Sequence, residues 1–132
     1  MRKHSFSSFI GLFLISVLLY SCASTESYSV RGVVIRLAPE DNGKGRIVIL
    51  HEAIKDFKNQ EGEVVGMDPM AMSFGLKEKG MLSSVEMGDK VSINFSMRWK
   101  KEPRMMITAM QRLDQKVELN LGGYVIEGAK PK

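Results

Sequence analysis

The 132-residue chain has a single cysteine, Cys22, and only two histidines, His4 and His51. One thiol cannot form an internal disulfide or build the multi-thiolate sites that hold structural zinc. The sequence also lacks a glycine-rich phosphate loop and a histidine–acid pair at a suggestive spacing. We therefore expect a protein that is not an enzyme.

No apolar run is long enough to cross a bilayer. The longest, residues 9–20, has 12 residues, whereas a spanning helix needs ~20. It follows the basic residues Arg2 and Lys3, and the small, polar Ser21 comes directly after it. A basic start, a short apolar stretch and small residues after it are typical of a secretory signal.

The segment Leu19-Tyr20-Ser21-Cys22 resembles the lipobox of bacterial lipoproteins. The resemblance implies that residues 1–21 are a lipoprotein signal peptide, that cleavage precedes Cys22, and that Cys22 carries the lipid. Residues 22–27 then form a tether. Because Ala23 rather than aspartate follows Cys22, we expect a periplasm-facing anchor, with the outer membrane favoured.

The sequence also lacks a large excess of positive or negative charge. Removing residues 1–21 removes two of the 19 basic residues and none of the 15 acidic ones, so the formal charge falls from +4 to +2. A nearly balanced domain has no electrostatic footprint for nucleic acid. We expect no nucleic-acid partner, and we expect a monomer.

Residues 28–116 read as one all-β domain. Short runs that alternate in polarity or are rich in β-branched residues are separated by turn signals, which is typical of a small sandwich or barrel. Closure into a barrel also hides unpaired strand edges, so we favour a five-stranded closed barrel. Residues 117–132 form a C-terminal extension. The expected strands are 28–37, 45–52, 70–76, 90–97 and 104–113.

The segment "MDPMAM", residues 67–72, contains three methionines. Alternation puts Met70 and Met72 on one face of a strand, about 6.6 Å apart. Pro69 belongs at the start of that strand, so Met67 lies just before it. The pattern leaves two interpretations open: the methionines fill the core, as methionine often does, or their thioethers are soft ligands.

Thioethers suit Cu(I) and Ag(I) and bind hard cations poorly. A two-thioether site usually needs one stronger donor. After cleavage, the only imidazole is His51, at the end of the expected strand 45–52. Adjacent strands of a small barrel could bring His51 near Met70 and Met72.

The phrases "HEAI…F…MDPMAMSF", "GDKVSINF" and "ITAMQRL" resemble those of the CusF-like periplasmic copper/silver-binding domains. The resemblance implies an OB-fold barrel with His51 as imidazole ligand and Met70 and Met72 as thioether ligands. Met67 stands where family members carry a capping residue, so it is expected to cap or ligate the ion. Trp99 does not match that position.

The resemblance departs at residues 58–66, "KNQEGEVVG", which separate Phe57 from Met67. This apparent insertion joins the two halves of the expected site and bears most directly on His51.

Together, these features favour a cell-envelope Cu(I)/Ag(I)-binding protein, a metallochaperone or carrier that hands its ion to a copper efflux pump or a copper-accepting protein. The alternative is a metal-free OB-fold lipoprotein that binds a protein or another ligand.

Overall fold

The computed structural model describes residues 25–41 and 45–124, which form five strands and one short 3-10 helix. No helix among these residues is long and apolar enough to span a membrane. The elements are β1 (Glu26–Pro39), β2 (Gly45–His51), β3 (Met70–Leu76), η1 (Leu82–Ser84), β4 (Lys90–Met97) and β5 (Met105–Arg112).

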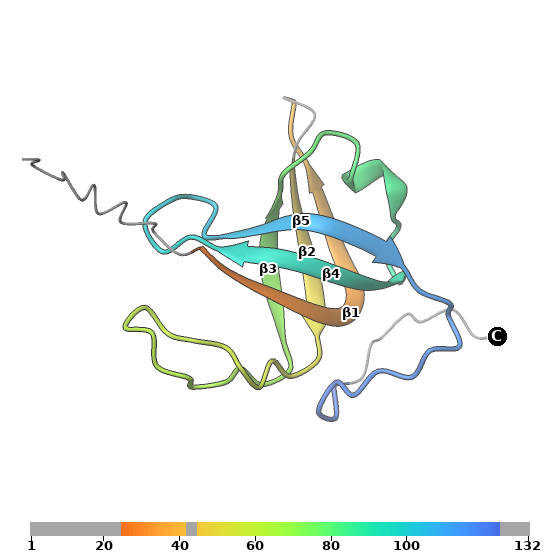
Figure 1. Ribbon diagram of the computed structural model, residues 1–132. Coiled ribbons are helices and arrows are strands. Elements are labelled where there is room, and N and C mark those ends of the chain that lie inside the picture. The colour runs from red at the N-terminus through yellow and green to blue at the C-terminus, as the bar shows by residue number, and fades with distance from the viewer. Residues whose placement is uncertain (1–24, 42–44, 125–132) are drawn as a thin grey trace, which may run out of the picture.

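The strands close into a barrel in the order β1-β2-β3-β5-β4 (Figure 1). All neighbouring pairs are antiparallel except β3 and β5, which are parallel. This five-stranded arrangement is that of an OB-fold and confirms the expected all-β closed barrel. Because the barrel is closed, each strand is paired on both sides.

Strand β1 is long enough to pair with β4 along its first half and with β2 along its second. The change occurs at Gly32, which pairs with both Val91 and His51. A Cβ at Gly32 would lie 2.5 Å from the carbonyl oxygen of Leu50. A glycine is therefore required where β1 passes closest to the end of β2.

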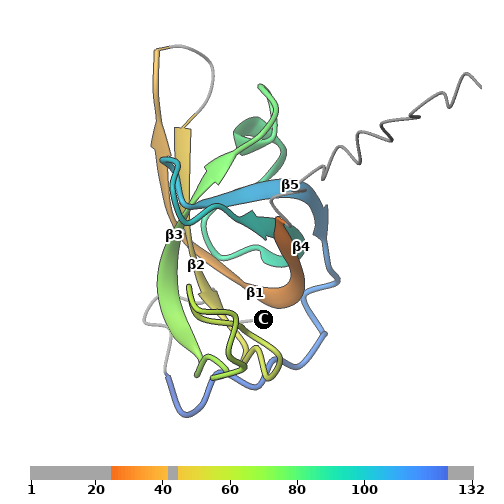
Figure 2. The same cartoon turned by 60° about the vertical axis from the view of Figure 1, so that its left-hand side comes forward.

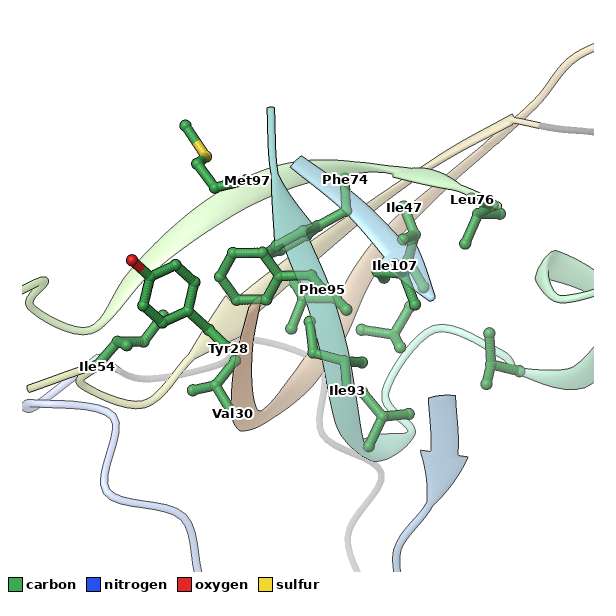
Figure 3. Close-up of a cluster of buried hydrophobic side chains, with 14 of the residues drawn as sticks. Tyr28, Val30, Ile47, Ile54, Phe74, Leu76, Ile93, Phe95, Met97 and Ile107 are labelled. Carbon is green, nitrogen blue, oxygen red and sulfur yellow. The ribbon is translucent and has the colours of Figure 1, made fainter. Parts of the chain in front are cut away.

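The core lies inside the barrel and is built on aromatic contacts between strands (Figure 3). Phe74 of β3 packs edge-on against Phe95 of β4, with ring centroids 5.1 Å apart. Tyr28 of β1 lies 5.5 Å from Phe95. Such pairs contribute beyond their buried area, and they link β1, β3 and β4 across the inside of the barrel.

Two boundaries bear on the site. β1 begins at Glu26, so its first two residues lie within the segment that the sequence suggested as a tether. Beyond Arg112 the chain leaves the barrel as an extended segment, which the structure describes as far as Tyr124. Figures 1 and 2 show this segment running beneath the end of the barrel where β2 meets β3.

Candidate metal centre

Three pairs of opposed, inward-facing residues on β2 and β3 run from the core to the open end of the barrel, which we call the barrel mouth. Directly opposed residues on antiparallel strands share a face, with Cβ atoms about 4.5–5.5 Å apart. The first inward pair is fully buried, and the last stands at the end of the ladder. From core to mouth the pairs are Ile47 with Phe74, Ile49 with Met72, and His51 with Met70.

The structure therefore brings three of the expected site residues together. His51 is directly opposite Met70 and diagonal to Met72 across the ladder. Diagonal neighbours lie about 7–8 Å apart, within reach of long side chains. Two flexible thioethers and one imidazole can converge on a common point at this end of the barrel.

His51 is fully buried, and its two ring nitrogens differ. Nδ1 lies 2.6 Å from the backbone carbonyl oxygen of Glu52. A carbonyl only accepts hydrogen bonds, so Nδ1 carries the hydrogen and Nε2 presents its lone pair. Nε2 has no hydrogen-bond partner in the protein. A buried acceptor without a donor is costly, and a bound metal ion would satisfy it.

Burial lowers the pKa of His51 below its ordinary value of 6.5, although the hydrogen bond to the Glu52 carbonyl opposes this shift. The imidazole is thus neutral at pH 7. A neutral ring is the form that binds metal.

The exposure of the β3 methionines bears on whether they are core side chains or are available as ligands. Phe74 is fully buried, Met72 is half-buried against the core, and Met70 is 40% exposed. Met70 is thus not a core residue, although it lies on the same face as Phe74. Met70 is directly opposite the fully buried His51 on the ladder.

Met67 lies three residues before Met70 and is hydrogen-bonded to Ile54, three residues beyond His51. The Ile54 amide donates to the Met67 carbonyl at 2.8 Å, and the Met67 amide donates back at 2.9 Å. This bridge keeps the register of the β2–β3 ladder. Met67 is half-buried against the core, at the same end of the barrel as Met70.

The apparent insertion, residues 58–66, extends the β2–β3 hairpin (Figure 1). Lys58 and Val64 form a second antiparallel bridge. The Asn59 side-chain oxygen accepts the amides of Glu61 and Glu63 and so closes the tip. At the base of this hairpin, the Ile54–Met67 bridge has the same register as the β2–β3 ladder. The insertion therefore leaves the His51–Met70 pairing intact.

The base of this hairpin is packed onto the barrel by aromatic rings. Phe57 is buried, with its ring centroid 5.1 Å from that of Tyr28. The Tyr28 hydroxyl accepts the Lys58 amide at 3.0 Å. Trp99, in the turn after β4, packs edge-on against Phe57 at 6.3 Å. Trp99 thus supports the hairpin base, consistent with its position after the fourth strand.

Sequence reasoning missed the residues that surround Glu52. The Arg31 guanidinium donates to both Glu52 carboxylate oxygens at 2.8 and 2.9 Å. The Asn120 amide donates to Oε1 of the same carboxylate at 2.8 Å. Partial burial raises the pKa of Glu52, but these hydrogen bonds and the Arg31 charge outweigh it, and the net pKa is lowered. No local signal could have linked these residues, because they are far apart in the sequence.

Across the described ranges, no group of three His, Cys, Asp or Glu side chains gathers into a metal site. Cys22, the expected lipid attachment point, and residues 1–21, the expected signal peptide, lie outside the described residues.

Comparison with known proteins gives one family and several solved structures. The family model described as "Copper binding periplasmic protein CusF" matches residues 27–112. A structure of apo-CusF from Escherichia coli is 22% identical and covers 73% of this chain and 98% of that one, with a TM-score of 0.49. CusF–Ag(I) from Escherichia coli is 22% identical and covers 70% and 98%, with a TM-score of 0.48. No curated protein matches the chain.

Proposed function

Because the chain belongs to the CusF family of copper-binding periplasmic proteins, we propose that it binds Cu(I) or Ag(I) at the mouth of the barrel. His51 supplies Nε2, Met70 and Met72 supply thioether sulfurs, and Met67 caps or ligates from the hairpin. The observation that carries the proposal is the orphaned Nε2 of His51, buried on the face that it shares with the two methionines.

The chemistry of these ligands suits a soft monovalent ion. An imidazole and two thioethers are neutral, so the bound site keeps the ion's single positive charge. Thioethers select Cu(I) and Ag(I) over the harder divalent ions. The Glu52 carbonyl holds the ring by Nδ1 and so directs Nε2 at the ion before it arrives.

The same features suit a carrier. Few, neutral ligands release an ion more readily than thiolates do, and Met70 is exposed enough for an acceptor to reach. We propose that the protein hands its ion to a copper efflux pump or to another copper-accepting protein. A lipid on Cys22 would hold the barrel at the periplasmic face of a membrane, with the outer membrane favoured.

The test is a Cu(I) titration against a competing chromogenic chelator. The variant Met70→Leu/Met72→Leu keeps shape and loses both sulfurs. We expect its affinity to fall by more than the ~10–100-fold typical of losing an outer-shell partner. Met81→Leu/Met87→Leu, which changes two loop methionines near η1, is the matched control and should bind as wild type does.

Equal binding by wild type and Met70→Leu/Met72→Leu would sink the site assignment. A wild-type protein that binds no Cu(I) or Ag(I) would instead favour the alternative, a metal-free OB-fold module that binds a protein or another ligand.

A further inference from the structure

The segment after β5 is fastened to the barrel at three places. We name residues 113–124 the strap. At its start, the Leu113 amide donates to the Lys90 carbonyl at 2.7 Å. Lys90 Nζ then donates to the carbonyls of Gln115 and Val117 at 2.7 and 2.5 Å. The strap is therefore tied to the beginning of β4 before it crosses the barrel end.

The second half of the strap alternates like a strand. Val117, Leu119 and Leu121 are half-buried, whereas Glu118 and Asn120 are exposed. An extended chain with period two presents its apolar side chains to one face. Val117, Leu119 and Leu121 therefore share the less exposed face of the strap.

The strap ends on the residues next to the proposed ligands. The Asn120 amide reaches the carboxylate of Glu52, and Glu52 is the residue whose carbonyl holds His51. Gly122 stands against Pro69, which precedes Met70. A Cβ built on Gly122 would come 3.2 Å from Pro69 Cγ, and Gly122 has a φ of +64°. One segment thus contacts the neighbours of ligands on both β2 and β3.

We propose that the strap is a positioning element for the soft-metal site: the Asn120 amide fixes Glu52 and thereby His51, and Gly122 fixes Pro69 and thereby Met70. The inference rests on the proposed function. Residues 113–124 lie beyond the range that the family model matches, which ends at Arg112.

The strap contacts the barrel through a hydrogen bond to a charged group, the Glu52 carboxylate, and not through packing alone. Its side chain is 16% exposed, and Arg31 holds it from β1 while Asn120 holds it from the strap. Hydrogen bonds to a charged group are about twice as strong as neutral ones. Without the Asn120 amide, the carboxylate keeps Arg31, and the Glu52 amide still donates to the Arg31 carbonyl at 2.9 Å, so we expect the hold on the Glu52 carbonyl to loosen but not to be lost.

The test compares Asn120→Pro, which lacks the amide hydrogen, with Asn120→Ala, which keeps it. The first measurement is NMR of the His51 ring in the metal-free protein. Its Nδ1 hydrogen should exchange faster in Asn120→Pro, whereas the backbone amides of Leu76 and Ile107, which pair at the opposite end of β3 from Met70, should not. General destabilisation would speed all of them.

The second measurement is the rate of Ag(I) release to a competing chelator. We expect release from Asn120→Pro to be about threefold to tenfold faster than from Asn120→Ala, below the ~10–100-fold effect of losing a direct outer-shell partner. Should Asn120→Pro not fold, Gly122→Ala, which presses on Pro69, takes its place in the release experiment, with the same expected direction.

Either readout staying at the Asn120→Ala value would overturn the strap proposal. Failure of wild type to bind Ag(I) is a different result. It removes the proposed function, and the exchange of the His51 ring hydrogen alone then decides whether the strap positions that ring.

Discussion

The two halves of β3 share one inward face but differ in burial. At its C-terminal half, Phe74 and Leu76 are sealed in the core. At its N-terminal half, Met72 is half-buried and Met70 is 40% exposed. A side chain that points inward is thus not necessarily a core side chain. Where the barrel opens, the same strand pattern places Met70 directly opposite His51, whose buried Nε2 has no hydrogen-bond partner.

The largest expected effect concerns the buried half. Phe74→Ala removes a fully buried ring that packs against Phe95. We expect a loss of about 3–5 kcal/mol in the free energy of unfolding, from lost transfer energy and the cavity left behind. Urea denaturation followed by far-UV circular dichroism measures it. A loss under ~1 kcal/mol would show that this half of β3 is not the core.

Substitutions in the N-terminal half of β3 should change the free energy of unfolding only slightly. Met70→Leu and Met72→Leu keep volume and hydrophobicity, and such exchanges usually cost under ~1.5 kcal/mol each. Both single variants should unfold close to the wild-type midpoint in urea. If either costs as much as Phe74→Ala, the methionine is a packing residue and the contrast between the two halves fails.

A smaller effect comes from pH. The pKa of His51 is lowered in the folded protein, below the 6.5 that it has when unfolded. Well above pH 6.5 both states hold a neutral ring, so His51 adds no pH dependence to the stability. As the pH falls below 6.5, the unfolded state takes up the proton first, so stability declines until the lowered folded pKa is passed.

Thermal unfolding of the metal-free protein between pH 7.5 and 5 should show this decline. His51→Gln should flatten the curve across that window. Glu52 leaves the window unaffected, because its lowered pKa acts only as the pH falls below its ordinary value of 4.5. An unchanged slope in His51→Gln would mean that the buried ring is not what titrates.

The smallest effect is expected on the returning arm of the hairpin, just after its tip. Val64 and Val65 are 63% and 58% exposed, and surface substitutions usually change stability by no more than ~0.5 kcal/mol. Val64→Ser/Val65→Ser should leave both the urea midpoint and Cu(I) affinity at wild-type values. A clear loss of affinity would mean that the insertion takes part in the site.

The sequence was sufficient for the strands and the inward face of β3, because alternation with period two is a local property. It could not predict that His51 pairs with Met70. Residues 58–66 made the offset between the strands uncertain, and the Ile54–Met67 bridge sets it. The contacts of Glu52 could not be predicted from local patterns either, because Arg31 is 21 and Asn120 is 68 residues away in the sequence.

The central claim is that His51, Met70 and Met72 hold one soft ion. X-ray absorption at the copper edge of the Cu(I)-loaded protein tests it most directly, because nitrogen and sulfur scatter differently. We predict one nitrogen and two or three sulfurs in the first shell, with one sulfur fewer in Met72→Leu. A shell of nitrogen and oxygen alone, or one unchanged in Met72→Leu, would contradict the claim.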